Sequence, residues 1–456
     1  MKRDMIHLER RVLHLNFRTF IFFMVACFTA HAGASQVVKV EVKKNGNKWE
    51  LIREGVPYYI KGGGGQKNLD KLKEIGGNSF RTWSLDDAEE FLDEAEKRGL
   101  TVMMGLWVQH ERHGFDYDDE IAVKKQLDFF TKRVKKLKDH PALLMWGIGN
   151  EVDLFYKNTK VWHLVQDIAK MIHEVDPNHP TSTVTAGLDS LEVDLIKRNC
   201  PDIDIYGVNT YGDLENAIKN IGKFGWTGPY MITEWGVNGH WEVAKTLWDA
   251  PIEQSSSQKA VSFKERYGMI AADSLNCLGS YAFLWGQKQE TTATWYGLFS
   301  KNGKSTEAID VLEKEWRGKN PANSCPAISS FLITKDNNKV DNNYLLASYT
   351  YDVEVKFTDI DGDKLKVTYM VVQESTDVKA GGDAENAPPS LNGLIKKKSN
   401  SSAAFKAPSK EGAYRLFVYA YDKNNHMAYV NIPFYVKPSD VKKKVRLKKR
   451  NLKFEY

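Results

Sequence analysis

The sequence predicts an α/β protein, a (β/α)8 barrel followed by a small β-sandwich. Two observations support this prediction. From about residue 55 to 318, short apolar runs alternate with charged, amphipathic segments of helical length, which is the pattern of repeated βα units around a parallel sheet. After 318–327 the helical segments stop, and short runs of alternating polarity follow, separated by Gly, Asn, Asp and Pro turns, as in a sandwich.

Eight apolar runs fit the strands of the barrel, and helix-like segments such as "DDAEEFLDEAEKRG" and "VWHLVQDIAKMIHEV" lie between them. The eight runs are 57–62, 77–83, 100–107, 143–150, 181–187, 203–211, 229–236 and 278–285. The sandwich strands are expected in "YDVEVKFTD", "KLKVTYMVVQ", "AYRLFVYAYD" and "AYVNIPFYV". We therefore assign residues 35–320 to the barrel and 321–438 to an immunoglobulin-like sandwich.

The first 34 residues have the pattern of an export signal. A basic region ending at Arg18 precedes "TFIFFMVACFTA", a run too short to span a membrane, and the small-residue sites "AHA" and "AGA" follow. We expect an exported protein, located in the periplasm, at the cell surface or outside the cell. "MVAC" resembles a loose lipobox, in which lipidation of Cys27 would anchor the chain to a membrane; the alternative is an ordinary, cleaved signal.

The formal charge of +5 comes from the two ends of the chain. Residues 1–18 carry a net charge of +3 and residues 440–456 carry +6, so the part between them is −4. This distribution does not indicate a nucleic-acid partner, and the basic tail, 439–456, is expected to be a solvated end. Cys200, Cys277 and Cys325 are widely spaced, which indicates neither a disulfide framework nor a zinc site.

Polar and aromatic residues gather where the predicted strands end. Active sites of (β/α)8 barrels lie at the C-terminal ends of the strands, so this is the expected position of a site. The residues concerned are Arg81, Trp83, Trp107, Gln109, His110, Glu111, His113, Asn150, Glu151, Asp153, Asn209, Tyr211, Glu234, Trp235, Trp285 and Gln287.

Glu151 in "GIGNE" and Glu234 in "YMITEWG" each directly follow an apolar run, 83 positions apart on the fourth and seventh strands. Hydrolysis of a glycosidic bond needs two such carboxyl groups, one to protonate the leaving oxygen and one to act as nucleophile or base. A single Glu at a strand end is more often a surface residue or an ion-pair partner. Two of them, together with Asn150 and Arg81, favour catalysis.

The motifs "WGIGNE", "ITEWG" and "NSFRTW", and the Trp that ends the eighth run, resemble the clan A glycoside hydrolases, retaining enzymes with a (β/α)8 barrel. The resemblance covers roughly residues 55–318 and implies Glu151 as general acid/base and Glu234 as nucleophile. The other roles that it implies are binding of the sugar 2-hydroxyl by Asn150, support of the nucleophile by Arg81 and Tyr211, and a platform under the sugar formed by Trp285.

Within this clan, an exported barrel with a C-terminal immunoglobulin-like domain is similar to the bacterial endo-β-1,3-glucanases of family 158. Family 2 enzymes carry sandwich domains before the barrel, whereas only residues 35–56 precede it here, which argues against family 2. The resemblance implies an endo-acting monomer that cuts β-1,3-glucan such as laminarin, without a cofactor or metal. Since a pyranose ring presents C–H faces to an indole, Trp107, Trp235 and Trp241 are further expected platforms.

Several alternatives remain open from the sequence. The enzyme could be an exo-acting glucosidase, mannosidase or galactosidase, and a non-catalytic glycan-binding protein is disfavoured only by the intact Glu151/Glu234 pair. His110 and His113 are expected to form hydrogen bonds to substrate or to neighbours and not to bind a metal. "DIDGDKL", 359–365, suits a turn better than a calcium loop, since it lacks the Glu that completes an EF-hand.

Overall fold

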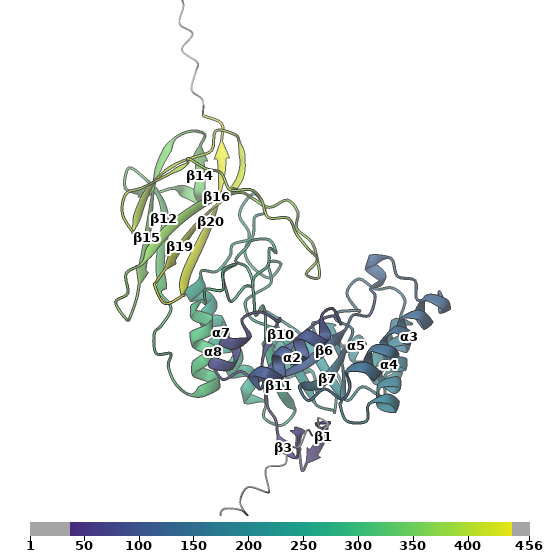
Figure 1. Ribbon diagram of the computed structural model, residues 1–456. Coiled ribbons are helices and arrows are strands. Elements are labelled where there is room, and N and C mark those ends of the chain that lie inside the picture. The colour runs from purple at the N-terminus through teal and green to yellow at the C-terminus, as the bar shows by residue number, and fades with distance from the viewer. Residues whose placement is uncertain (1–36, 440–456) are drawn as a thin grey trace, which may run out of the picture. The chain divides into compact units, whose positions relative to one another are not determined.

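The computed structural model describes residues 37–439, and it confirms a (β/α)8 barrel followed by an antiparallel sandwich (Figure 1). The export signal with Cys27, and the basic tail from residue 440 onwards, lie outside the described residues. No helix in the described part of the chain is long and apolar enough to cross a membrane.

Each of the eight predicted runs overlaps one strand of a closed parallel barrel. The strands are β4 (Ile60–Gly64), β5 (Ser79–Arg81), β6 (Thr101–Leu106), β7 (Leu143–Ile148), β8 (Thr181–Ala186), β9 (Ile205–Asn209), β10 (Tyr230–Trp235) and β11 (Cys277–Ala282). Their order around the barrel follows the chain, with β11 pairing with β4 to close it. The strands are buried on both faces, which explains why they are continuous apolar runs and do not alternate.

A helix follows each strand and covers the outside of the barrel. The helices are α1 (Leu69–Glu74), α2 (Ala88–Arg98), α3 (Glu120–Leu137), α4 (Val161–Val175), α5 (Ser190–Asn199), α6 (Leu214–Asn220), α7 (Ser256–Ala272) and α8 (Glu307–Arg317). Local signals fix some of their ends: the Asp119 carboxylate accepts from the first amides of α3, and Ser255 and Gln258 form a capping box at α7.

A small sheet at the start of the described chain closes the bottom of the barrel. It consists of β1 (Val40–Asn45), β2 (Lys48–Arg53) and β3 (Val56–Pro57) in antiparallel order. Val40 and Leu51 belong to the same buried cluster as Met103 and Met231 of the barrel interior. Because this sheet packs at the N-terminal ends of the strands, the opposite end, where the strands finish, stays open for a site.

The sandwich consists of two antiparallel sheets around a core that includes Val353, Phe405, Leu416 and Phe434. One sheet has the order β13-β12-β15-β18-β17, and the other has β14-β20-β19-β16, with β14 parallel to its neighbour. The ranges are β12 (Ala327–Lys335), β13 (Asn338–Lys339), β14 (Tyr344–Leu346), β15 (Thr350–Thr358), β16 (Lys366–Gln373), β17 (Ile395–Lys397), β18 (Ser402–Lys406), β19 (Gly412–Tyr421) and β20 (Met427–Lys437).

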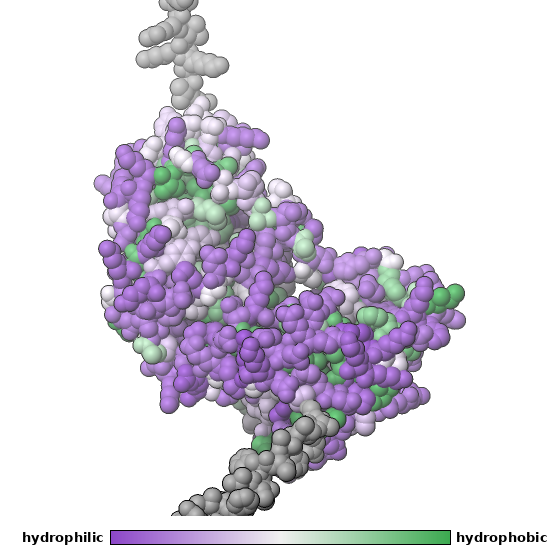
Figure 2. Space-filling view, viewed as in Figure 1, coloured by the Kyte–Doolittle hydropathy of each residue, from purple (hydrophilic) through white to green (hydrophobic). Residues whose placement is uncertain are grey.

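The segment 359–363 forms the expected turn after β15, because Asp359 Oδ1 accepts hydrogen bonds from the amides of Asp361 and Asp363. The apolar side chains of both domains lie mainly inside, and the face seen in Figure 2 is largely hydrophilic with scattered apolar patches. The three described cysteines, Cys200, Cys277 and Cys325, are buried free thiols.

Candidate active site

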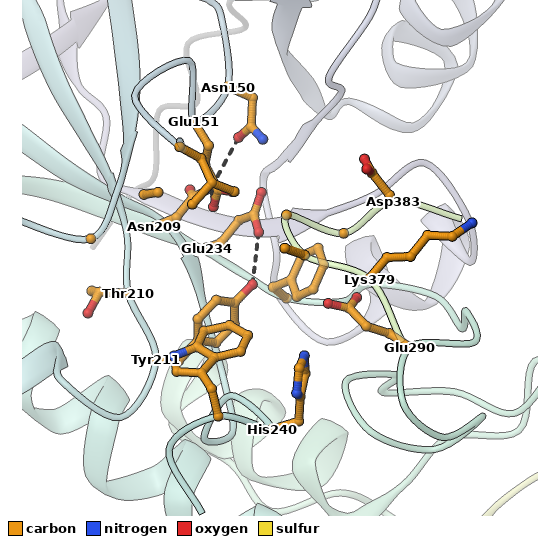
Figure 3. A pocket seen from close by; sticks show the side chains of 18 of the residues that line it. Asn150, Glu151, Asn209, Thr210, Tyr211, Glu234, His240, Glu290, Lys379 and Asp383 are labelled. Atoms are coloured by element: carbon orange, nitrogen blue, oxygen red, sulfur yellow. Dashed lines mark hydrogen bonds between the residues drawn. The ribbon is translucent and has the colours of Figure 1, made fainter. Parts of the chain in front are cut away.

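Glu151 lies in a tight turn directly beyond β7. The strand ends at Ile148, and Gly149 and Glu151 both have positive φ, +72° and +51°. Glycine adopts this conformation freely, and a Cβ at residue 149 would lie 2.9 Å from the side chain of Val152. For a glutamate the left-handed conformation costs about 1–3 kcal/mol and is concentrated at functional sites. The turn directs the Glu151 carboxyl into a pocket at the barrel mouth (Figure 3).

Glu234, the second-last residue of β10, is 5% exposed and accepts three side-chain hydrogen bonds. Arg81 Nη1 and Trp83 Nε1 donate to Oε1 at 3.0 and 2.8 Å, and the Tyr211 hydroxyl donates to Oε2 at 2.9 Å. The Arg81 guanidinium is buried, and it also donates to the Thr233 carbonyl. These contacts fix the orientation of the carboxylate and balance its charge.

Glu151 has a different environment. Asn209 Nδ2 donates to its Oε1 at 2.8 Å, and no other side-chain hydrogen bond to this carboxyl is found among residues 37–439. Burial raises the pKa of Glu151 to about 7, and the negative charge of Glu234 adds to this increase, while the Asn209 hydrogen bond and Arg81 oppose it. At neutral pH this carboxyl therefore holds a proton for a substantial part of the time.

Asn150 connects the two carboxyl groups. Its Oδ1 accepts hydrogen bonds from Arg81 Nη2 at 2.7 Å and from Asn209 Nδ2 at 3.1 Å. Arg81 also donates to Glu234, and Asn209 also donates to Glu151. The side-chain amide nitrogen of Asn150 donates to no residue in the described part of the chain. Since Asn150 lines the pocket, this amide is available to a substrate hydroxyl.

The pocket has a volume of about 810 Å³ and is lined by both domains. The sandwich contributes residues 378–383, which belong to a long segment between β16 and β17, residues 374–394, that we name the arm. Asp383 pairs with Arg112 at 2.8 and 3.2 Å, and Lys288 Nζ donates to the Gly382 carbonyl at 2.9 Å. The arm is thus clamped across the barrel mouth, opposite the two glutamates in Figure 3.

Besides His240, six aromatic side chains line this pocket: Trp83, Trp107, Phe155, Tyr211, Trp241 and Phe283. The Trp107 ring stacks on His110 at 4.8 Å, and Trp241 is 58% exposed. Phe283 lies one residue beyond the end of β11 and packs against Trp83 and Tyr211. These rings offer apolar faces to a sugar.

Two of the expected platforms lie outside the pocket. Trp235 follows Glu234 in β10, and because successive side chains of a strand point to opposite faces, it packs against Phe263 and Tyr267 of α7. Trp285 lies in the space above Gly63, where a Cβ would approach its ring to 2.6 Å, and stacks on Trp316. The expectation that these two rings support a sugar is therefore corrected; near the same strand end, Phe283 lines the pocket and Trp285 does not.

His110 also lies outside the pocket, and it contacts neighbours instead of a substrate. It is stacked between Trp107 and His113, and Arg112 Nε donates to its Nδ1 at 3.1 Å. Burial, with a smaller contribution from Arg112, lowers the pKa of His110 to about 4, so the ring is neutral. In the described structure, His110 packs against the Trp107 ring and so helps to hold it in place.

Some pocket residues were recognised at strand ends but given no role, and others were missed. Trp83 and Asn209, which hydrogen-bond the two glutamates, belong to the first group, and their position at the ends of β5 and β9 was the available signal. Glu290, Lys288 and the arm belong to the second group. No local pattern in the sequence marks them, because they reach the pocket from a loop after β11 and from the sandwich.

The pocket wall is acidic. It contains six carboxylate residues, namely Glu151, Asp213, Glu234, Glu242, Glu290 and Asp383, against the lysines Lys288 and Lys379. Lys288 is already paired with Glu290 at 2.7 Å. Burial raises the pKa of Glu290, and Lys288 opposes this increase. The electrostatic environment of the pocket therefore favours a neutral or cationic ligand over an anionic one.

Two clusters of side chains within residues 37–439 could hold a metal ion, and neither includes a residue of the pocket. One is Asp93, Glu96 and His140 on the outside of the barrel, and the other is Asp359, Asp363 and Asp422 in the sandwich. In the second cluster the Lys423 amine pairs with Asp363 at 3.0 Å.

Comparison with known proteins finds a family match within the barrel. Residues 66–254 match the family described as "Glycosyl hydrolases family 2, TIM barrel domain", and this stretch contains both Glu151 and Glu234. Among curated proteins, the chain is 26% identical over 281 residues to a β-glucuronidase of Paenibacillus borealis, covering 55% of this chain and 45% of that enzyme. It is 27% identical over 150 residues to the β-glucuronidase of Felis catus, covering 32% and 21% of the two chains. The chain thus spans less than half the length of these relatives.

Solved structures give a weaker likeness. The β-glucuronidase of Ruminococcus gnavus matches with a TM-score of 0.48 and 15% identity, covering 62% of this chain and 53% of that one. A calcium-binding mutant of Bacteroides uniformis β-glucuronidase 2 matches with a TM-score of 0.49 and 13% identity, covering 88% and 48%.

The comparisons support part of what the motifs implied. The barrel is of the glycoside hydrolase kind, in the retaining clan, as the resemblance implied. The similarity to the endo-β-1,3-glucanases of family 158 finds no support in these matches. The argument against family 2 was wrong for the barrel, because it depended on domains outside the barrel, whereas the family match depends on the barrel residues themselves.

Proposed function

We propose that this protein is an exported, retaining β-glycosidase that removes a terminal sugar from a β-linked glycan. One observation supports this proposal above the others: Glu234 and Glu151 share one pocket but have opposite environments. Arg81, Trp83 and Tyr211 hold Glu234 as an oriented carboxylate, whereas burial beside Glu234 raises the pKa of Glu151 to about 7. A nucleophile and a proton donor with these properties are what retaining hydrolysis requires.

In the first step of this mechanism, a Glu234 oxygen attacks the anomeric carbon of the bound sugar. The bond from that carbon to the glycosidic oxygen breaks, and the proton of Glu151 moves to the leaving oxygen. The product is a glycosyl ester of Glu234, and Glu151 is left as a carboxylate. The hydrogen bond from Asn209 to Glu151 then favours this charged form.

In the second step, the Glu151 carboxylate takes a proton from a water molecule, whose oxygen attacks the anomeric carbon. The ester bond to Glu234 breaks, which regenerates both glutamates. Because the carbon is attacked twice from opposite faces, the product keeps the β configuration. The free amide of Asn150 and the Phe283 ring are suitably placed to bind the sugar through both steps.

Exo action is preferred to endo action for two reasons. The curated relatives are named after one sugar, glucuronic acid, and not after a polysaccharide. The arm is clamped over the barrel mouth by Arg112 and Lys288, so that it walls the pocket around the glutamates.

A glucuronide, the substrate after which the relatives are named, is not the substrate that we propose for this protein. A uronic acid carries a negative charge. Among the six carboxylate residues of the pocket wall, Glu234, Asp383 and Glu290 are paired with Arg81, Arg112 and Lys288, which leaves Glu151, Asp213 and Glu242 against Lys379. A neutral hexose avoids repulsion from these groups, so glucosides, galactosides and mannosides are the preferred candidates.

The test is a panel of 4-nitrophenyl β-D-glucoside, β-D-galactoside, β-D-mannoside and β-D-glucuronide, with laminarin, mixed-linkage glucan and β-mannan as polymers. We expect turnover of at least one neutral aryl glycoside, a β-configured first product by NMR, and a single sugar as the early product from a glycan. Glu234→Gln should have no activity beyond background and an unchanged melting temperature. Absence of turnover by the wild-type protein, or wild-type activity in Glu234→Gln, would end the proposal.

An endo-β-1,3-glucanase is the second candidate, favoured by one observation. Trp241 is 58% exposed beside the pocket, and Trp107 lies in the same wall, so that stacking surfaces extend away from the glutamates. On laminarin, an endo enzyme would release a ladder of oligosaccharides at the earliest times, whereas the exo enzyme proposed above would release one product.

A further inference from the structure

The turn after β7, residues 149–155, carries a second carboxyl group that the two steps of hydrolysis described above do not use. Glu151, Leu154 and Phe155 of this turn line the catalytic pocket, whereas Asp153 does not. The Asp153 side chain lies on the other side of the turn, where it contacts β8. A role for Asp153 in the reaction would therefore be exerted through Glu151 and not by contact with a sugar.

Two hydrogen bonds tie this turn to β8. Ala186, the last residue of β8, donates its backbone N–H to both carboxyl oxygens of Asp153, at 3.1 Å to Oδ1 and 3.0 Å to Oδ2. Two positions earlier in the turn, the backbone N–H of Glu151 donates to the Val184 carbonyl of β8 at 2.9 Å. Because the chain is held at residue 151 and again at residue 153, the direction in which the Glu151 side chain leaves the backbone is fixed.

The same end of β8 is bound to β9, which holds Glu151 from its other side. The Gly187 N–H donates to the Asn209 carbonyl at 2.7 Å, and the Asn209 side chain donates to Glu151 Oε1 at 2.8 Å. The contacts form a closed path, from the turn through Asp153 to β8, on to β9, and back to the Glu151 carboxyl. Without the Asp153 contact, the distance between the turn and Asn209 would be less firmly set.

The conformation of the turn depends on such anchors. Glu151 and Phe155 have positive φ, +51° and +59°, and residues other than glycine keep this conformation only where the surrounding structure fixes it. Asp153 lies between the two. The Tyr156 hydroxyl is another anchor, since it donates to Glu192 of α5 at 2.9 Å, but it lies beyond Phe155 and further from Glu151 along the chain.

Asp153 has no ion-pair partner in the described part of the chain. Burial raises its pKa to about 8, the charge of Glu151 adds to this increase, and the hydrogen bond from the backbone opposes it. The other ionisable groups near Asp153 are the Glu192 carboxyl and the phenols of Tyr156 and Tyr206, none of which is a cation. At neutral pH Asp153 is therefore mostly uncharged, and asparagine, which has the same shape and an amide oxygen, can accept the same hydrogen bond.

We propose that Asp153 is a positioning residue, which holds Glu151 in the place from which it transfers its proton. The Asp153 carboxyl ties the turn to Ala186 of β8, and the Glu151 carboxyl is thereby kept beside Asn209 in the pocket that contains Glu234. This proposal rests on the proposed function, because it assigns Asp153 to the proton transfer by Glu151.

Asp153→Ala tests the proposal, because it removes the contact with Ala186. Asp153→Asn is the matched conservative variant, since it keeps an acceptor for the same N–H. Asp167→Ala is a further control, because Asp167 is an exposed residue of α4 that does not line the pocket and has no side-chain partner among residues 37–439. The substrates are laminaritetraose, cellotetraose and β-1,4-mannotetraose, each compared with the 2,4-dinitrophenyl β-glycoside of the same sugar.

On the tetrasaccharide that the wild-type protein cleaves best, we expect kcat/KM to fall about 10- to 100-fold in Asp153→Ala, because a displaced acid protonates the leaving oxygen poorly. On the dinitrophenyl glycoside, whose leaving group needs no proton, the same variant should stay within about threefold of wild type, which also shows that it is folded. Asp153→Asn and Asp167→Ala should stay within about threefold on both substrates. Equal losses of Asp153→Ala on both substrates, no loss on the tetrasaccharide, or a loss in Asp153→Asn as large as in Asp153→Ala would overturn the proposal.

The pKa of Glu151 is a readout that does not depend on turnover. It can be measured by ¹³C NMR of protein labelled at the glutamate carboxyl carbons, with Glu151→Gln to identify the signal. We expect a pKa of about 7 in the wild-type protein and in Asp153→Asn, and a fall towards 4.5 in Asp153→Ala, because the released carboxyl moves into water and away from Glu234. An unchanged pKa in Asp153→Ala would overturn the proposal.

This measurement separates the proposal from the function on which it rests. If the wild-type protein hydrolyses nothing but the pKa of Glu151 falls in Asp153→Ala and not in Asp153→Asn, the proposed function fails and the positioning role stands. If hydrolysis occurs but Asp153→Ala keeps the wild-type rates on both substrates and the wild-type pKa, the positioning role fails and the function stands.

Discussion

At the scale of single residues, the proton on Glu151 determines how activity depends on pH. Burial and the charge of Glu234 raise the pKa of this carboxyl from 4.5 to about 7. A proton donor must be protonated to act, so the acid form is available below this pKa and is lost as the pH rises through about 7. We expect kcat/KM on an oligosaccharide to fall above about pH 7, whereas an unshifted glutamate would place the fall near pH 4.5.

The Asn209 hydrogen bond lowers the pKa of Glu151, so removing it should move the alkaline limb to higher pH. The pH profiles of the wild-type protein and Asn209→Ala, compared on one substrate, check this direction. An alkaline limb in Asn209→Ala at lower pH than in wild type would contradict the assignment of the limb to Glu151.

If Glu151 is the proton donor, the loss of activity in Glu151→Ala should depend on the leaving group of the substrate. Glu151→Ala should lose about 10²–10⁴-fold on an oligosaccharide, whose leaving oxygen needs a proton, and far less on a 2,4-dinitrophenyl glycoside, whose leaving group departs without one. Azide should restore turnover of the aryl substrate and give a β-glycosyl azide, because it attacks the Glu234 ester from the face that Glu151 has left open. Equal losses on both substrates without azide rescue would remove Glu151 from this role.

At the scale of elements, the arm between β16 and β17 is the least regular part of the pocket wall, and side-chain contacts hold it in place. The Asp383 carboxylate accepts two hydrogen bonds from Arg112 and lies 3.2 Å from His113. We expect Asp383→Ala to raise KM about three- to tenfold while changing kcat less, since the arm contacts the substrate but not the reacting atoms. Steady-state kinetics measure this split.

The control is Glu354→Ala, which removes an exposed carboxylate of β15 that does not line the pocket and has no side-chain partner among the described residues. It should behave as wild type in both kcat and KM. If Asp383→Ala leaves KM unchanged as well, the arm does not contribute to substrate binding.

At the scale of the whole molecule, a buried polar network joins the barrel to the sandwich. Lys259 of α7 pairs with Glu253 at 2.6 Å, and both side chains are at most 5% exposed. Asn431 of β20 donates to the same Glu253, and the Tyr429 hydroxyl lies 3.0 Å from the Lys259 amine. Arg415 of β19 donates to the Pro251 carbonyl in the barrel. The sandwich is thus joined to the barrel through buried groups, and Arg415 of the same joint also binds Glu374 at the start of the arm.

Lys259→Met should therefore destabilise the protein by about 3–5 kcal/mol, because it leaves the Glu253 carboxylate buried without its counter-charge. Denaturant unfolding followed by tryptophan fluorescence measures this change. Lys264→Met, on the exposed side of the same helix, is the matched control and should stay within about 0.5 kcal/mol of wild type. If the free energy of unfolding falls as little in Lys259→Met as in this control, the joint contributes little to stability.

The sequence by itself determined the barrel, the sandwich and the two glutamates. The length of an apolar run and the position where it stops are local properties, and in a parallel barrel they fix both the strand and the residues at its C-terminal end. Glu151 and Glu234 could be found for this reason. So could Arg81 and Tyr211, which donate to Glu234, and Asn150, which accepts from Arg81.

Only the tertiary structure decided which aromatic rings face the pocket and what closes it. Trp235 and Trp285 stand at strand ends as Trp107 does, but the pleat of β10 and the room above Gly63 direct them into the core. Asp383 of the arm lines the same pocket as Glu234 from nearly 150 positions further along the chain, held there by contacts such as that with Arg112. Contacts this distant leave no periodic pattern in the sequence, because the backbone between their partners can follow many paths until both domains have packed.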